Sequence, residues 1–269
     1  MSQKHRGYAV ITGASSGIGA EFAKRLAKEG FDLVLVARRK ARLEELCKDM
    51  HQNMEKGQEC LLLEADLSSL DECVKLCDFL QGKKIAIFIN NAGFGDCSRF
   101  LDGDIDKELR MIDVNVKAVH FLTKKILQIM QKQKGGYLLN VASSAGLMPA
   151  GPYMAAYYAS KAYVASLTRA IAQEFKEKKS PIYVGCLCPG PVKTEFDEVA
   201  NVDCSLKGIS ASYCANYAID QMIQRKTVIV PTLEMKLAML FGRFLPQSLY
   251  IRIAAHQQRK KMDEDKDTE

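Results

Sequence analysis

The sequence predicts an α/β protein with one doubly wound parallel sheet of about seven strands and helices on both faces. Three observations predict this fold. Short apolar runs of strand length alternate with longer amphipathic stretches of helical period. A glycine-rich turn joins the first apolar run to the first helix. The chain has 269 residues without an internal repeat or linker, a length that suits a single domain.

The elements follow one another in a regular order. The first strand is a buried apolar run, and Gly30 ends the helix that follows it. Because crossover connections are right-handed, we expect the strand order 3-2-1-4-5-6-7. The expected strands are Ala9–Thr12, Asp32–Ala37, Glu59–Glu64, Ile85–Asn90, Gly136–Val141, Ile182–Cys188 and Thr227–Val230. The expected helices are Gly17–Glu29, Lys40–Lys56, Ser69–Leu80, Ile105–Gln133, Tyr157–Lys178 and Ser210–Gln224.

Composition excludes several classes of function. The net charge of +6 is modest, and no basic stripe with interleaved aromatic residues indicates a nucleic-acid partner. The sequence has no apolar run of about 18 residues and no apolar signal segment at its start, so we expect a cytoplasmic protein. The nine cysteines suggest neither a disulfide framework nor a metal site, because Cys73 and Cys77, or Cys186 and Cys188, lack a second pair of ligands.

The glycine-rich turn has the features of a phosphate-binding loop. It reads Gly13-Ala-Ser-Ser-Gly17-Ile-Gly19 and lies between the first strand and the first helix. Such a turn lets the backbone approach a pyrophosphate at the positive end of a helix. The spacing is one residue wider than the common dinucleotide fingerprint, and glycine clusters also form plain loops. The turn alone is therefore a moderate indication of a nucleotide site.

A second cluster carries acid–base chemistry. Tyr157 and Lys161 are four residues apart, so they share one face of a helix, and Ser144 precedes them. An ammonium beside a phenol favours the phenolate, and such a phenol can exchange protons near neutral pH. A serine hydroxyl would hold the same carbonyl oxygen. These three side chains suit the reduction of a ketone or the oxidation of an alcohol if a hydride carrier binds.

Together these motifs resemble the short-chain dehydrogenase/reductase family over residues 7 to about 195. The resemblance implies a Rossmann-type fold and a nicotinamide cofactor. It implies that Asp66 contacts the adenine amino group, that Asn90-Asn91-Ala92-Gly93 stabilises the sheet beside the cofactor, and that the Pro189–Thr194 segment covers the nicotinamide. The catalytic residues that it implies are Asn115, Ser144, Tyr157 and Lys161, where Asn115 holds a water behind the lysine. Its implied cofactor contacts are Gly13, Ser15, Ser16, Gly17, Ile18, Gly19, Arg38, Arg39, Asp66, Leu67, Asn91, Ala92, Gly93, Tyr157, Lys161, Pro189, Gly190, Val192 and Thr194.

The end of the second strand indicates which nicotinamide cofactor binds. A carboxylate there would bind the ribose 2′-hydroxyl of NAD and repel a 2′-phosphate. Arg38 stands there instead, followed by Arg39 and Lys40, and a guanidinium binds phosphate in a bidentate way. The alternative is a solvated helix start, but positive charge at a helix N-terminus opposes the helix dipole unless an anion is present. We therefore expect NADP(H).

The residues expected around the substrate are mostly apolar. They are Phe94, Ser144, Met148, Met154, Tyr157 and Phe196. The segment Glu195–Gly208 should form a mobile lid. This lining favours a hydrophobic ketone or alcohol, with hydroxysteroid-like compounds first and a 3-ketoacyl chain as the close rival. A nucleotide-binding regulator without catalysis is the alternative from another class, although it would usually lack the serine, tyrosine or lysine.

The C-terminal part extends past the last expected strand. We expect residues 1–232 to form the nucleotide-binding and catalytic domain, residues 233–260 to form two helices broken at Pro246, and residues 261–269 to be a disordered charged tail. The extension resembles that of 17β-hydroxysteroid dehydrogenases and 3-ketoacyl reductases. Three interpretations are open. The extension packs over the substrate pocket or forms a subunit contact, or it lies on a membrane surface, or the predicted end of the last strand is misplaced and there is no true extension. The resemblance also implies a homodimer or homotetramer built through the long central helices.

Overall fold

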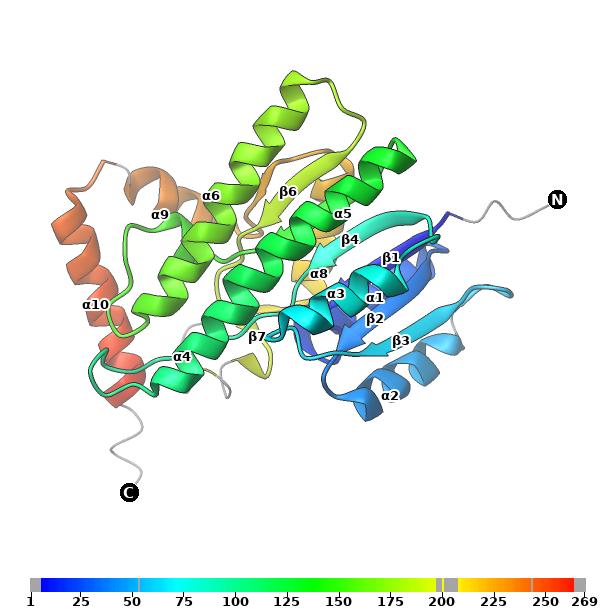
Figure 1. Ribbon diagram of the computed structural model, residues 1–269. Coiled ribbons are helices and arrows are strands. Elements are labelled where there is room, and N and C mark those ends of the chain that lie inside the picture. Colours follow the sequence, from blue (N-terminus) through cyan, green and yellow to red (C-terminus); the bar gives the residue numbers. More distant parts are fainter. Residues whose placement is uncertain (1–5, 53, 197–199, 201–207, 243, 264–269) are drawn as a thin grey trace.

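Seven parallel strands form the central sheet of the computed structural model, which describes residues 6–52, 54–196, 200, 208–242 and 244–263 (Figure 1). The strand order is β3-β2-β1-β4-β5-β6-β9, which confirms the predicted doubly wound topology. The seven strands are β1 (Tyr8–Thr12), β2 (Asp32–Ala37), β3 (Cys60–Glu64), β4 (Ile85–Asn90), β5 (Tyr137–Val141), β6 (Tyr183–Leu187) and β9 (Val228–Ile229). The fold is a single Rossmann-like domain.

Helices cover both faces of the sheet. One layer contains α1 (Gly17–Lys28), α2 (Lys40–His51) and α8 (Ala211–Ile223), whose inward residues include Phe22, Leu43 and Cys214. The opposite layer contains α3 (Leu70–Phe79), α5 (Val119–Gln133) and α6 (Ala155–Glu177). Strand β2 is buried on both faces, which explains why it reads as a continuous apolar run after Asp32.

Several boundaries differ from the sequence prediction. The second helix ends at His51 rather than Lys56. Gly57 adopts a positive φ of 94°, which a helix does not contain. The side-chain amide of Gln58 donates to the carbonyls of Ala27 and Phe31, so the chain is already bound beside the start of β2 at this point. The turn after β5 also contains a short 3₁₀ helix, Ser144–Leu147, that the pattern did not predict.

The long helix expected over Ile105–Gln133 has three parts. These are α4 (Ile105–Ile112), a π-helical stretch (Asp113–Ala118) and α5. Apolar periodicity cannot reveal a π-helical stretch, because one wider turn leaves the pattern of buried residues nearly unchanged. A small parallel pair, β7 (Val192–Lys193) and β8 (Ile209–Ser210), was also not expected. It holds together the two ends of the segment that follows the sixth strand of the sheet.

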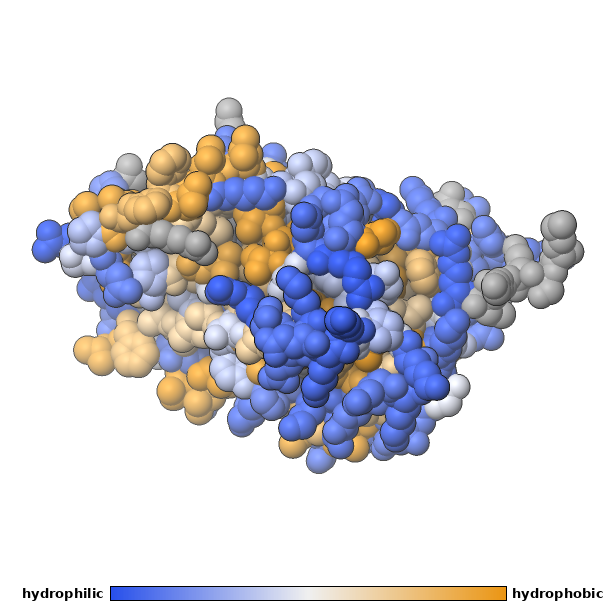
Figure 2. Space-filling model, turned by 90° about the horizontal axis from the view of Figure 1, so that it is seen from above, coloured by the Kyte–Doolittle hydropathy of each residue, from blue (hydrophilic) through white to orange (hydrophobic). Residues whose placement is uncertain are grey.

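Two helices follow β9, on either side of Pro246. They are α9 (Leu233–Gly242) and α10 (Gln247–Asp263), as the sequence predicted. Helix α10 extends three residues into the tail expected from Lys261, and residues 264–269 lie outside the described part. Helix α9 is mostly apolar, with Glu234 and Lys236 as its charged residues, yet has no buried residue, and Figure 2 shows apolar side chains gathered at this end of the molecule. Within the described ranges, no helix is both long and apolar enough to span a bilayer.

Candidate active site

A cavity of about 1030 Å³ lies at the carboxyl ends of the strands. It runs from the glycine turn after β1, past α6, to α9 and α10. All of the predicted cofactor and substrate residues line it except Gly19, which lies behind the wall of the cavity. Asn115, predicted as catalytic, also lies behind this wall. The topology therefore brings together motifs that lie as far apart in the sequence as Gly13 and Thr194.

The glycine turn is fixed by close backbone contacts. Gly13 and Gly17 have positive φ angles of 64° and 55°. A Cβ on Gly19 would lie 2.3 Å from the Gly13 carbonyl oxygen, so only glycine allows α1 to start this close to β1. The Asn91 amide donates to the carbonyl oxygens of Thr12 (2.9 Å) and Gly13 (3.2 Å). This cradle at the N-terminus of a helix fits a pyrophosphate.

Thr12 completes the connection between the turn and the end of β4. Its hydroxyl accepts hydrogen bonds from the backbone N–H groups of Asn91 (2.9 Å) and Ala92 (3.0 Å) and donates to the Ile89 carbonyl. Deeper in the sheet, the buried Asn90 amide donates to Asn140 at 2.8 Å. These bonds give a physical basis for the sheet-stabilising role expected of the Asn-Asn-Ala-Gly motif.

Positive charge gathers where β2 meets the glycine turn. The Arg39 guanidinium donates to the hydroxyls of Ser15 and Ser16 at 3.2 and 2.8 Å. It also forms an ion pair with Glu195 at 2.9 Å. Arg38, which we expected to be the main contact of the 2′-phosphate, lines the same cavity with an exposed side chain. This donor set suits a phosphate beside the ribose.

Asp66 lies at the edge of the cavity after β3. Burial opposes its charge, but hydrogen bonds from Ser68 and the guanidinium of Arg110 outweigh that effect and hold the Asp66 pKa below its usual range. Its carboxylate is therefore charged at neutral pH. That charge state suits acceptance of a hydrogen bond from an amino group, as the family resemblance implied.

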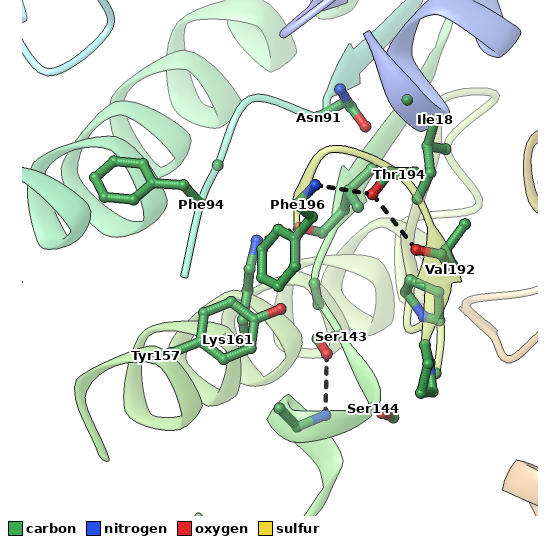
Figure 3. A pocket seen from close by; sticks show the side chains of 18 of the residues that line it. Ile18, Asn91, Phe94, Ser143, Ser144, Tyr157, Lys161, Val192, Thr194 and Phe196 are labelled. Carbon is green, nitrogen blue, oxygen red and sulfur yellow. Dashed lines mark hydrogen bonds between the residues drawn. The ribbon is translucent and has the colours of Figure 1, made fainter. Parts of the chain in front are cut away.

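Tyr157 and Lys161 project from the first turns of α6. Both are buried, with 8% and 5% of their surface exposed. The Lys161 Nζ lies 5.9 Å from the centre of the Tyr157 ring and donates to the Val141 carbonyl at 3.1 Å. Burial lowers the Lys161 pKa to about 8, although the nearby Cys188 thiol acts in the opposite direction. Figure 3 shows the two side chains side by side on the helix.

Asn115 comes from the π-helical stretch. Its Nδ2 donates to the Phe94 carbonyl (2.9 Å) and to the Ser160 hydroxyl (3.1 Å), and its Oδ1 accepts from the Phe94 N–H. A Cβ on Gly93 would meet both Asn115 Oδ1 at 2.8 Å and Lys161 Nζ at 3.1 Å. Asn115 and Lys161 therefore converge behind Gly93.

The two serines after β5 make different hydrogen bonds. Ser143 is extended, with φ −169°, and its hydroxyl caps the 3₁₀ helix by accepting from the Ala145 N–H at 3.1 Å (Figure 3). Ser144 starts that helix, its backbone N–H donates to the Pro189 carbonyl, and both serines line the cavity. Sequence spacing singles out Ser144 as the catalytic serine, and this stays a prediction.

An apolar wall surrounds the reacting centre. Met154, Tyr157 and Tyr158 pack together with Phe94, Met148 and Phe196. The ring centre of Phe196 lies 5.5 Å from that of Tyr157, whereas the Phe94 ring points away from it in Figure 3. Thr194, before Phe196, packs against Gly17, because a Cβ there would lie 3.1 Å from the threonine methyl. Residues 197–199 and 201–207 of the expected lid lie outside the described residues.

Sequence reasoning did not name the part of the wall that α9 and α10 supply. Phe241, Tyr250, Ile253 and Gln258 line the cavity, and the Gln258 amide donates to the Tyr158 hydroxyl at 2.9 Å. The apolar extension after the last strand was the available signal. This arrangement agrees with the expectation that the extension packs over the pocket.

Comparison with known proteins identifies the family. The short chain dehydrogenase family model matches residues 7–204. This chain is a member of that family. A short-chain dehydrogenase from Sphingobium yanoikuyae, solved in complex with NADPH, superimposes with a TM-score of 0.79 and 30% identity over 88% of this chain and 93% of that one. The family consists of oxidoreductases that act on CH–OH groups.

Two relatives indicate the range of substrates within the family. A very-long-chain 3-oxoacyl-CoA reductase from Neurospora crassa is 34% identical over 66% of this chain and 54% of its own length. A 17-beta-hydroxysteroid dehydrogenase type 3 from Homo sapiens is 32% identical over 73% of this chain and 62% of its own length. The chain thus aligns with little more than half the length of each relative.

Proposed function

We propose that this short-chain dehydrogenase interconverts a hydrophobic ketone and a secondary alcohol with NADP(H). The observation that carries the proposal is the buried Tyr157–Lys161 pair, which opens onto a cavity with a glycine cradle at one end and an apolar wall at the other. NADP(H), when bound, would supply or accept a hydride. The residues of the chain would position the oxygen of the substrate and move its proton.

Tyr157 is the proposed proton donor in the direction of reduction. A carbonyl oxygen becomes negative as hydride arrives at its carbon, and the tyrosine O–H donates its proton to that oxygen. The Lys161 ammonium stabilises the resulting phenolate electrostatically. Ser144 is the proposed hydroxyl that binds the same oxygen, because it lines the cavity while the neighbouring Ser143 hydroxyl caps the 3₁₀ helix through the Ala145 N–H. Asn115 positions the lysine from behind.

The choice of NADP(H) rests on the charge beside the ribose site. Arg38, Arg39 and Arg42 lie after β2 with no carboxylate among positions 38–42. The hydroxyls of Ser15 and Ser16 provide further hydrogen-bonding groups. NAD lacks the 2′-phosphate, so it would not neutralise the charge of these guanidinium groups. The Sphingobium protein, solved with NADPH, supports the same choice.

The proposed substrate is bulky and mostly apolar, with hydroxysteroid-like compounds before 3-ketoacyl chains. Met148, Met154, Phe196, Phe241 and Ile253 supply an apolar wall of irregular shape. Flexible methionines accommodate bulky groups of varied shape. The human and Neurospora relatives support one option each. A nucleotide-binding regulator without catalytic activity is disfavoured because the tyrosine, the lysine and the serine are all present.

Assembly and location are part of the proposal. We propose a homodimer or homotetramer built through α4, α5 and α6, where Ile105, Leu109 and Tyr163 are exposed apolar residues. The cytoplasm is the proposed compartment. Peripheral contact with a membrane through α9 and α10 is the alternative use of their exposed apolar side chains. Light scattering of the purified protein and flotation with anionic liposomes separate the two.

The proposal is tested by NADPH oxidation and NADP⁺ reduction with ketosteroids and hydroxysteroids, aliphatic ketones and 3-ketoacyl thioesters. NADH and NAD⁺ serve as matched cofactors. We expect turnover with bulky apolar ketones and a higher kcat/KM with NADPH than with NADH. Tight NADPH binding without turnover of any compound would favour the regulator instead.

A further inference from the structure

Glu195 lies at a position that an anionic ligand would be expected to take. It follows Thr194 at the end of the segment that leaves the sixth strand. Its carboxylate forms ion pairs with Arg39, at 2.9 Å, and with Arg42. These two guanidinium groups lower the Glu195 pKa, so the carboxylate is charged at neutral pH. It connects the cation cluster after β2 with the segment beside the reacting centre.

The groups around this carboxylate suit a phosphate. Arg39 also donates to the hydroxyls of Ser15 and Ser16, so two guanidinium groups and two hydroxyls lie together at the adenosine end of the cavity. A phosphate monoester carries nearly two negative charges at pH 7 and three strong acceptor oxygens, whereas a carboxylate carries one charge and two oxygens. A bound 2′-phosphate would therefore outcompete Glu195 for the two arginines.

Phe196, the next residue, packs over the catalytic tyrosine. Its ring centre lies 5.5 Å from that of Tyr157. A Cβ on Gly95 would lie 2.7 Å from the edge of the Phe196 ring, so the phenylalanine fits closely against that glycine. In Figure 3 the ring lies across the space above Tyr157 and Lys161. The ion pairs of Glu195 thus hold an aromatic ring over the reacting centre.

We propose that Glu195 is an internal substitute for the 2′-phosphate of NADP(H). In the free protein its carboxylate occupies the two arginines and keeps Phe196 on Tyr157. The 2′-phosphate displaces the carboxylate, and the adjacent Phe196 leaves the tyrosine. A cofactor without this phosphate cannot replace the ion pairs, so Glu195 makes access at Tyr157 depend on the 2′-phosphate. The inference rests on the proposed use of NADP(H).

The first test is binding, measured by the fluorescence of NADPH and NADH without substrate. In Glu195→Gln the carboxylate no longer competes, so the NADPH Kd should fall about fivefold, the factor that corresponds to ~1 kcal/mol for exposed ion pairs. The NADH Kd should change less than about twofold. Glu72→Gln removes an equal charge from the ion pair with Lys75, away from the cavity, and should change neither Kd.

The second test follows Phe196 directly. The chain contains no tryptophan, so a Phe196→Trp variant has a single indole emission. We expect 2′,5′-ADP, which carries the 2′-phosphate without a nicotinamide, to shift this emission to the red as the ring moves into water. Adenosine 5′-monophosphate should leave the emission unchanged. Adding Glu195→Gln to the reporter should produce the red shift without any ligand.

Three results would overturn the inference. One is an NADPH Kd in Glu195→Gln equal to that of Glu72→Gln, and another is weaker NADPH binding, which would make Glu195 a clamp over the bound cofactor. The third is an equal response of the reporter to both adenosine phosphates. These measurements need no substrate. A protein that passes them and still reduces no ketone would contradict the proposed reaction while leaving the role of Glu195 intact.

Discussion

At the scale of single residues, two neighbouring serines line the cavity beside Tyr157. Ser143 and Ser144 are neighbours, and a fixed spacing from Tyr157 predicts the second. The chain is still extended at Ser143, so its side chain lies on the same side of the strand end as Val141, whose carbonyl binds Lys161. The Ser143 hydroxyl caps the 3₁₀ turn that begins at Ser144, and a count of residues cannot predict such a turn.

This difference gives a prediction with a matched control. Ser144→Ala removes the hydroxyl that would bind the developing oxyanion, so kcat/KM should fall about 100-fold with NADPH binding unchanged. Ser143→Ala should stay within about threefold of the wild type. Steady-state kinetics with a reducible ketone measure both. The opposite order of the two variants would assign the role to Ser143.

At the scale of elements, sequence pattern predicted the strands and their order because each strand is a short apolar run between turns. The π-helical stretch was not predictable, although it places Asn115 against Ser160 and behind Gly93. The wall from α9 and α10 was predicted as a pair of helices but not residue by residue. Contacts such as Gln258 with Tyr158 span 100 positions and depend on how the helices pack.

The glycine turn supports a prediction at this scale. Gly19→Ala would place a methyl group 2.3 Å from the Gly13 carbonyl, so the start of α1 must move away from β1. We expect a loss of about 2 kcal/mol in the free energy of unfolding and weaker NADPH binding. Gly135→Ala is the control, because no atom lies within 4 Å of its added methyl. Equal urea midpoints for the two variants would show that the turn is looser than described.

At the scale of the whole molecule, the buried charge of Lys161 lowers the free energy of unfolding. Lys161 keeps a charge inside the protein, where burial lowers its pKa from 10.5 to about 8. Below pH 8 both the folded and unfolded states hold the proton, and the folded state bears the full cost of burying the charge. Between pH 8 and 10.5 only the unfolded state holds it, so this cost disappears as pH rises.

Lys161→Met should therefore stabilise the cofactor-free protein at pH 7. The pKa shift corresponds to about 3 kcal/mol, an upper limit because the variant loses the hydrogen bond to Val141. The advantage over the wild type should shrink as the pH approaches 10. Urea unfolding at pH 7 and 10 measures it, with the exposed Lys132→Met as control. An advantage that does not change with pH would mean that the lysine is buried without charge.

The central claim is that the residues of this cavity transfer hydride and proton between a nicotinamide and a ketone. The most direct measurement uses NADPH deuterated at both positions of nicotinamide C4, with a bulky apolar ketone that the protein reduces. We predict one deuterium on the new carbinol carbon with the wild-type protein, and no product with Tyr157→Phe despite unchanged NADPH binding. A carbinol without deuterium, or near-normal turnover by Tyr157→Phe, would contradict this account.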